Sequence, residues 1–116
     1  MTPLLLIDGD HNFRQALAIA LRLDGHQVTA AESVELARRE LERGEYGWCI
    51  VDLRLEGAAE LVSALVAGAR AGVVATSIDP DLLADTLGRH PEIAALEKPF
   101  RVDDLRALLG PTSAVA

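Results

Sequence analysis

The sequence predicts an α/β domain in which a five-stranded parallel sheet is covered by helices on both faces. Short apolar runs alternate five times with stretches of helical periodicity. The runs are apolar throughout, as expected of parallel strands that are buried on both faces of a sheet. The 116 residues suffice for one hydrophobic core, and no linker, internal repeat or low-complexity segment divides them.

Each element is predicted from a local signal. Strands are expected where the apolar runs lie, over residues 3–8, 27–31, 48–52, 73–76 and 93–97. Helices are expected between them, over residues 12–24, 34–43, 58–71, 80–88 and 102–109. Ser33 and the pair Asp79-Pro80 are typical helix starts, and Gly44 is a typical helix end. We expect one domain over residues 1–110 and a flexible tail or linker stub over residues 111–116.

Composition excludes several classes of function. The net charge is −7, so the phosphate backbone of a nucleic acid would repel this chain. The only cysteine, Cys49, cannot form an internal disulfide, and its place in an apolar strand indicates a core residue. No apolar run has membrane-spanning length, and the first three residues lack the basic start of a signal peptide. We therefore expect a cytoplasmic protein that binds neither nucleic acid nor membrane.

Chemically active side chains follow four of the predicted strands. Asp8 ends the first strand, Asp52 ends the third, and Thr76-Ser77 and Lys98 follow the last two. Because the carboxyl ends of parallel strands meet at one edge of the sheet, these groups are expected to converge there. Carboxylates, a hydroxyl and a lysine form a set suited to metal-assisted phosphoryl chemistry.

Four motifs, in order along nearly the whole chain, resemble one family. They are Leu5-Leu6-Ile7-Asp8-Gly9-Asp10-His11-Asn12-Phe13-Arg14, Ile50-Val51-Asp52-Leu53-Arg54-Leu55-Glu56-Gly57, Ala75-Thr76-Ser77 and Lys98-Pro99-Phe100. Together they are similar to the CheY-like receiver domain of bacterial two-component response regulators. The resemblance implies a flavodoxin-like (βα)5 fold with strand order 2-1-3-4-5, whose active edge lies at the switch point.

The resemblance also implies roles at this edge. Asp52 would be the phosphoacceptor, taking a phosphoryl group from a phosphohistidine on a sensor histidine kinase or phosphotransfer protein. Mg²⁺ would be held by Asp52, by Asp8 and by the backbone carbonyl of Arg54, with Asp10, a further acid of the pocket, as an alternative ligand. The chain would then be a signalling domain rather than an enzyme.

The remaining family positions concern the phosphate. Thr76 and Lys98 would contact it, and Ser77 is the alternative hydroxyl. The family pattern also implies a cis bond between Lys98 and Pro99. The face formed by the fourth helix, the fifth strand and the fifth helix would be the surface for a homodimer or another partner.

The chain departs from the family pattern at several positions. Gly9 stands where a second acid is usual, which predicts a degenerate acidic pocket with weaker Mg²⁺ affinity. Ala95 stands where an aromatic switch residue is usual, and Glu56 where proline is common. The spacing from Asp52 to Thr76 is also shorter than usual.

Two alternatives remain open from the sequence. Gly9 and Ala95 favour a pseudo-receiver that docks partners without phosphorylation. The order Asp8-Gly9-Asp10 also resembles the start of haloacid-dehalogenase-type phosphatases, in which the first acid is the nucleophile. The short chain and Asn12, where that family has threonine, count against the phosphatase.

Overall fold

The computed structural model describes residues 3–110; the predicted tail over residues 111–116 lies outside the described part. Five parallel strands form one sheet in the order β2-β1-β3-β4-β5. Their bounds are β1 Pro3–Ile7, β2 Gln27–Ala31, β3 Trp48–Asp52, β4 Gly72–Ser77 and β5 Ala94–Glu97. The flavodoxin-like fold and its strand order are confirmed.

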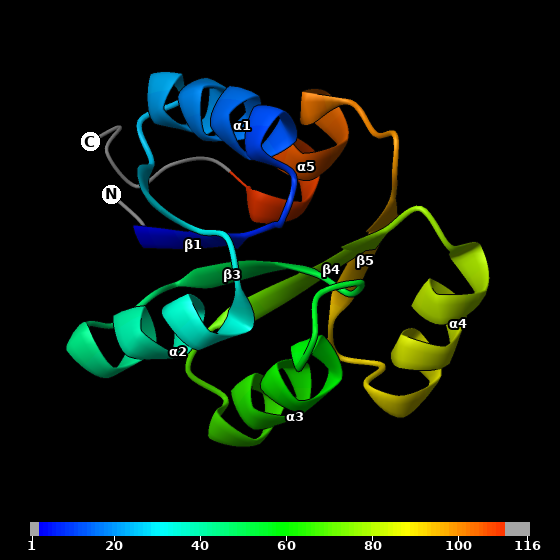
Figure 1. The fold of residues 1–116 in the computed structure, drawn as a ribbon. Coiled ribbons are helices and arrows are strands. Elements are labelled where there is room, and N and C mark those ends of the chain that lie inside the picture. Colours follow the sequence, from blue (N-terminus) through cyan, green and yellow to red (C-terminus); the bar gives the residue numbers. More distant parts are fainter. Residues whose placement is uncertain (1–2, 111–116) are drawn as a thin grey trace.

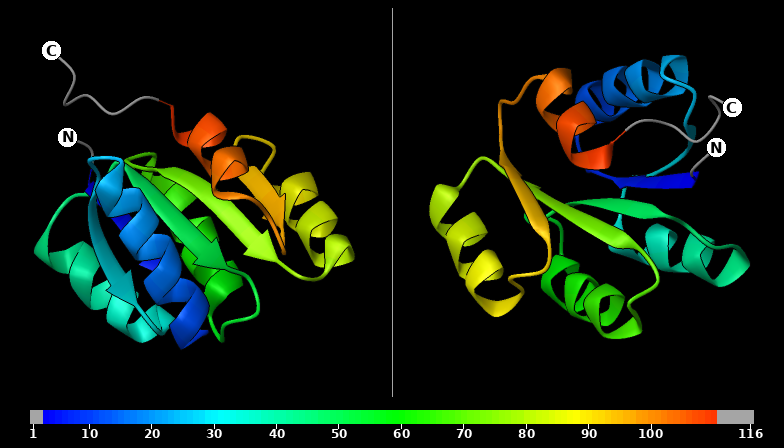
Figure 2. Two further views of the ribbon diagram at one scale, coloured as in Figure 1. Left: turned by 90° about the horizontal axis from the view of Figure 1, so that it is seen from above. Right: turned by 180° about the vertical axis from the view of Figure 1, so that it is seen from behind.

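Helices cover both faces of this sheet, as Figures 1 and 2 show. They are α1 His11–Leu23, α2 Val34–Arg43, α3 Ala58–Gly68, α4 Pro80–Arg89 and α5 Val102–Leu109. One buried cluster joins the sheet to α1 and α5, and another joins it to α2, α3 and α4. Both faces of the central strands are therefore withdrawn from water, which explains their continuous apolar sequences.

Several element ends differ from the prediction for local reasons. Asp10, rather than a later residue, caps α1, and its side chain accepts a hydrogen bond from the backbone of Phe13. α3 ends at Gly68 because Ala69 turns into the left-handed conformation with a φ of 51°. The helical periodicity of residues 58–71 predicts an inward position for Ala69, and this prediction is wrong, since the residue is exposed.

The other differences are shifts of one residue at an element end. β1 ends one residue earlier than predicted, β4 extends by one residue at each end, and β5 begins one residue later. α1 lies one residue earlier at both ends, and α4 continues through Gly88 to Arg89. α2 and β3 have the predicted bounds.

Cys49 is fully buried in β3, as the sequence indicated. Burial raises the pKa of its thiol to about 12, so the thiol stays protonated at neutral pH and is a poor nucleophile. Within residues 3–110, no helix combines the length and the apolar character needed to cross a bilayer.

Gly72 is required by the close approach of an indole ring. A Cβ at this position would lie 2.5–2.9 Å from three ring atoms of Trp48, its neighbour in register on β3. Gly72→Ala is expected to lower the free energy of unfolding by about 1–3 kcal/mol, because the ring has to move. Urea denaturation followed by Trp48 fluorescence measures this loss.

Gly88 provides the matched control for this substitution. It lies in α4, and a Cβ at this position would have no neighbouring atom within 4 Å. Gly88→Ala is expected to leave stability unchanged or raise it by up to about 1 kcal/mol, because alanine is the better helix former. Equal effects of the two alanine substitutions would contradict the steric role of Gly72.

Candidate phosphoacceptor site at the carboxyl edge of the sheet

The register of the central strands brings the predicted site residues to one face. Leu6, Ile50 and Val74 are neighbours across β1, β3 and β4, and all three pack under α1 and α5. Because side chains alternate along a strand, residues two positions further on point to the same face. Those residues are Asp8, Asp52 and Thr76.

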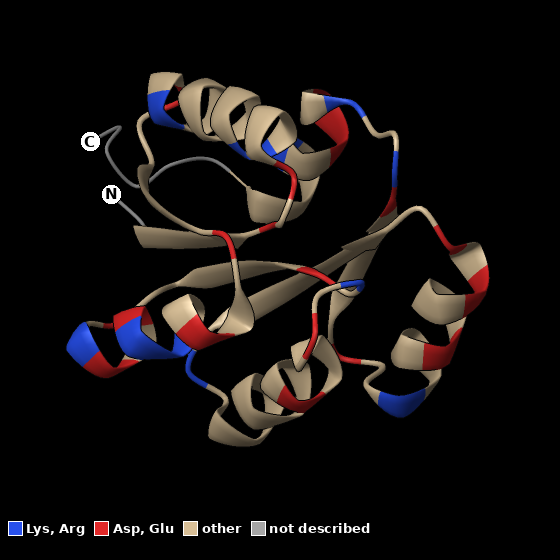
Figure 3. Cartoon of the chain, in the orientation of Figure 1, with Lys and Arg blue, Asp and Glu red and all other residues tan. Residues whose placement is uncertain are grey.

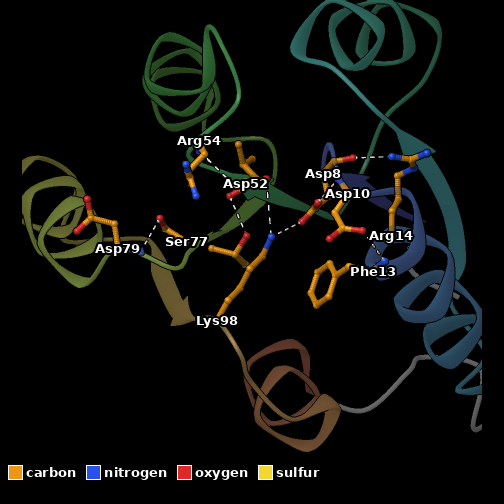
Figure 4. Close-up of polar contacts among 11 residues, drawn as sticks. Asp8, Asp10, Phe13, Arg14, Asp52, Arg54, Ser77, Asp79 and Lys98 are labelled. Atoms are coloured by element: carbon orange, nitrogen blue, oxygen red, sulfur yellow. Dashed lines mark hydrogen bonds and ion pairs between the residues drawn. The ribbon is translucent and has the colours of Figure 1, made fainter.

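Lys98 lies between the two carboxylates, as Figure 4 shows. Its Nζ is 2.6 Å from Oδ2 of Asp8 and 3.7 Å from Oδ2 of Asp52. The Lys98 side chain is 15 % exposed, while that of Asp8 is only 2 % exposed. The peptide bond from Lys98 to Pro99 is cis. Lys98 is also the chain's only lysine. Its ammonium group offsets one of the two negative charges of this acidic pair.

Backbone hydrogen bonds fix the orientation of both carboxylates. Oδ1 of Asp8 accepts a hydrogen bond from the backbone N–H of Asp10 at 2.8 Å. Oδ1 of Asp52 accepts one from the backbone N–H of Arg54 at 3.1 Å. Each acid therefore has one oxygen bound to the backbone of its own loop and the other directed towards Lys98.

Asp10 does not share this arrangement. It is exposed, and its carboxylate caps α1 through the 3.1 Å hydrogen bond from Phe13 N–H. Gly9, between the two acids, has no side chain to add to the pocket. A Cβ there would lie 3.1 Å from Cδ2 of Leu55, which packs over this glycine. The core of the site is therefore the pair Asp8 and Asp52 with Lys98.

The two candidate hydroxyls lie in different environments. Thr76 is 1 % exposed, and its Oγ1 donates to the carbonyl of Val51 at 3.5 Å. Ser77 is buried too, but its Oγ accepts a hydrogen bond from the backbone N–H of Asp79 at 3.0 Å. Ser77 thus helps to shape the start of α4, whereas Thr76 shares the face of the sheet that carries the acids.

Comparison with solved structures identifies this architecture. The response regulator TrrA of Thermotoga maritima, in complex with Mg²⁺-BeF, superposes with a TM-score of 0.82 at 21 % identity, covering 94 % of this chain and 96 % of its own. A response regulator receiver protein of Pseudomonas putida gives 0.81 at 25 % identity, covering 93 % and 94 %. The chain has the fold of a response regulator receiver domain.

A third receiver-fold structure is a response regulator from Burkholderia pseudomallei with a phosphorylated aspartic acid, a calcium ion and citrate. Its TM-score is 0.83 at 21 % identity, over 95 % of this chain and 67 % of that one. No protein-family model matches the sequence, and neither does any curated protein. The likeness is therefore carried by the three-dimensional arrangement far more than by overall sequence identity.

The receiver fold of this chain offers oxygen donors to a metal ion but few of them. In the described part of the chain, no three His, Cys, Asp or Glu side chains are grouped to hold a metal. Asp8 and Asp52 nevertheless present two buried carboxylates at one edge. Mg²⁺ is commonly bound by one or two carboxylates together with waters, so this donor set fits a magnesium ion.

Ala95, which the sequence analysis placed at the position of the receiver switch aromatic, has only a methyl side chain. Ala95 lies in β5, half-buried, and packs against the core cluster under α2, α3 and α4. A methyl group has no rotamers to exchange, so this position cannot report on the pocket by a side-chain swing. Glu56 is exposed in the loop after β3, outside the carboxylate pair.

Phe13 is a pocket residue that was not predicted from the sequence. The centre of its ring lies 4.5 Å from Nζ of Lys98. Its helical periodicity predicted only an inward-facing core position on α1. Its place beside the ammonium group is a tertiary contact with a residue 85 positions further along the chain (98 − 13), so no local sequence signal could have found it.

Proposed function

We propose that this chain is a receiver that accepts a phosphoryl group on Asp52 from a phosphohistidine of a sensor histidine kinase or phosphotransfer protein. The observation that carries the proposal is the meeting of Asp8, Asp52 and Lys98 at the carboxyl edge of a receiver fold. Asp52 is 9 % exposed, so it is open to a small group and shielded from bulk solvent.

The reaction is a nucleophilic displacement at phosphorus. An oxygen of Asp52 forms a bond to phosphorus while the phosphorus–nitrogen bond of the phosphohistidine breaks, and the leaving imidazole nitrogen takes a proton from solvent. Lys98 would turn from Asp8 and Asp52 to a phosphoryl oxygen and balance its negative charge. Thr76, on the same face of the sheet as Asp52, would donate its hydroxyl to another oxygen.

Asp8, Asp52 and the backbone carbonyl of Arg54 are the groups that would hold Mg²⁺. When bound, the ion supplies positive charge that offsets the charge gathering on the phosphoryl oxygens. The carboxylate of Asp10 caps α1, so its negative charge would attract the ion from a distance but would not act as a ligand. Because Gly9 contributes no acid, we expect Mg²⁺ to bind more weakly here than in a pocket with three carboxylates.

Exposure to acetyl phosphate and Mg²⁺, followed by intact mass measurement, tests this function. A small-molecule phosphoryl donor removes the need to know the partner kinase. The proposal expects a mass increase equal to one phosphoryl group. An unchanged mass at millimolar Mg²⁺ would instead favour a pseudo-receiver that docks partners through its fold alone, which Gly9 and Ala95 already make the second candidate.

Restoring the missing acid should strengthen metal binding. We expect Gly9→Asp to raise Mg²⁺ affinity by about fivefold or more, since a unit charge at ~4 Å contributes about 1–4 kcal/mol between aqueous and near-surface dielectric. The backbone of Gly9 is not left-handed, and the nearest obstacle is the movable end of Leu55, so aspartate can be accommodated. Isothermal titration calorimetry suits the measurement. Tryptophan fluorescence is a poor probe of the metal here, because Trp48 lies at the opposite end of β3 from Asp52.

Gly88→Asp is the matched control for this prediction. It adds the same charge on α4, where nothing lies within 4 Å of the new Cβ. Its Mg²⁺ affinity should equal that of the wild-type protein. If both aspartate variants bind Mg²⁺ equally, the metal does not lie beside Gly9.

The proposed partner surface is the face formed by α4, β5 and α5. In Figure 3 acidic positions, coloured red, lie along α4 and at the start of α5. Two of the arginines are already paired within the chain, Arg89 with Asp85 at 3.2 Å and Arg106 with Asp24 at 2.7 Å. The face could join two copies of the chain, and its acids would also suit a partner with basic side chains. We also propose a cytoplasmic location for this signalling domain.

A phosphatase with Asp8 as nucleophile is a weaker proposal. Oδ2 of Asp8 is engaged by Lys98 at 2.6 Å, and the second acid of that motif, Asp10, caps α1. Neither group is therefore free in the way that a nucleophile and a general acid need to be. We therefore favour a signalling domain over a hydrolytic enzyme.

A further inference from the structure

The ammonium group of Lys98 is surrounded on three sides. Asp8 and Asp52 approach Nζ at 2.6 and 3.7 Å, and the ring of Phe13 lies on a further side, 4.5 Å from Nζ to the ring centre. The face of an aromatic ring carries partial negative charge and attracts a cation within about 6 Å of its centre. Phe13 therefore attracts Lys98 and also keeps water from that side of the ammonium group.

Phe13 is itself held in place by two contacts. Its backbone N–H donates to the carboxylate of Asp10 at the start of α1. Its ring packs nearly perpendicular to that of Phe100, with centroids 5.6 Å apart and an interplanar angle of 87°. Phe100 follows Lys98 by two residues, so the ring pair joins the start of α1 to the segment that carries the lysine.

We propose that Phe13 is a positioning residue, which holds the ammonium group of Lys98 at the carboxylate pair so that it can meet an incoming phosphoryl group. The role rests on the proposed function of Asp52. A neutral ring suits this task, because it attracts the ammonium group without acting as an anionic ligand for Mg²⁺. A carboxylate in the same place would instead compete with the phosphoryl oxygens for Lys98.

The placement can be measured without any phosphorylation. Because Lys98 is the only lysine, protein labelled with ¹³C-lysine gives NMR side-chain signals from this residue alone. The ring current of Phe13 should shift the ε-proton signal of Lys98 upfield. Phe13→Leu should remove that shift, and Phe13→Tyr, which keeps the ring face, should retain it. The same signal in wild type and Phe13→Leu would overturn the proposal.

The rate of phosphorylation by acetyl phosphate gives a second readout. Phe13→Leu should lower this rate by about 3- to 30-fold, the range that cation–π contacts span from exposed to desolvated sites. Phe13→Tyr should stay close to wild type. Leu21→Val serves as the packing control, because Leu21 is a buried residue of α1 in the same core cluster. It should lower thermal stability but leave the Lys98 signal and the rate unchanged.

The two readouts separate this role from the proposed function. If the Lys98 signal depends on Phe13 but the protein gains no phosphoryl group, phosphorylation of Asp52 is contradicted and the placement of Lys98 by Phe13 is supported. If the wild-type protein and Phe13→Leu are phosphorylated equally fast, the positioning role is contradicted and the proposed function is unaffected. A rate lost equally in Phe13→Leu and Leu21→Val would assign the effect to packing and overturn the proposal.

Discussion

Asp52→Asn is expected to abolish the mass gain of one phosphoryl group after treatment with acetyl phosphate and Mg²⁺. The neutral amide is a far weaker nucleophile than a carboxylate, and it removes one of the two acids available to the metal. The exchange preserves size, so the amide oxygen can still accept the hydrogen bond from Arg54 N–H that now fixes Oδ1. Complete loss, rather than a partial decrease, is the expected outcome.

The control for this variant makes the same chemical change elsewhere. Asp85 is on α4 with its side chain 59 % exposed, and its substitution Asp85→Asn removes one acid from the surface. Its phosphorylation by acetyl phosphate should match that of the wild-type protein. A phosphoryl group that persists in Asp52→Asn would show that a different side chain is the acceptor, and peptide mapping would then locate it.

The fold could be read from the sequence because local and global signals agree. The helix α2 shows this agreement, since Ser33 caps its start and Gly44 closes its end, and both bounds were predicted. β3 is an apolar run buried in the middle of the sheet, and its predicted bounds also hold. The ends of α3 and β4 were missed. No residue of the sequence indicates the left-handed turn at Ala69, because glycine usually adopts that conformation and alanine seldom does.

Only the features of the site that follow from the strand topology could be predicted from the sequence. Parallel strands oblige Asp8 and Asp52 to meet at one edge, and the register then places Thr76 on their face. The distances within that edge depend on side-chain packing, which no sequence pattern specifies. Lys98 therefore proved to lie nearer to Asp8 than to Asp52. The ring of Phe13 beside its ammonium group is a tertiary contact of the same kind.

Lys98→Met is expected to destabilise the protein by about 3 kcal/mol in the absence of divalent metal. Removing one partner of a buried ion pair leaves the other charge without compensation, which costs about 3–5 kcal/mol. We expect the low end of this range because the Lys98 side chain is 15 % exposed, so water can reach the space that the ammonium group leaves. Urea denaturation in the presence of EDTA measures the loss. The same variant should be phosphorylated much more slowly, because nothing then balances the charge on the phosphoryl oxygens.

The cause of this instability can be tested by removing the stranded charge. In the double variant Asp8→Asn and Lys98→Met, the carboxylate that lies 2.6 Å from Nζ is neutral, so most of the lost stability should return. Equal stability of the single and double variants would show that Asp8 and Lys98 do not act as a pair.

Magnesium should also compensate for the missing ammonium group. In Lys98→Met the oxygens of Asp8 and Asp52 no longer face a competing cation, so Mg²⁺ is expected to bind more tightly and to stabilise the fold. At tenfold above its dissociation constant, the ion would contribute about 1.4 kcal/mol. A smaller response of the wild-type protein would show that Lys98 and the metal compete for the same two carboxylates. An identical Mg²⁺ response in both proteins would place the bound ion away from this pair.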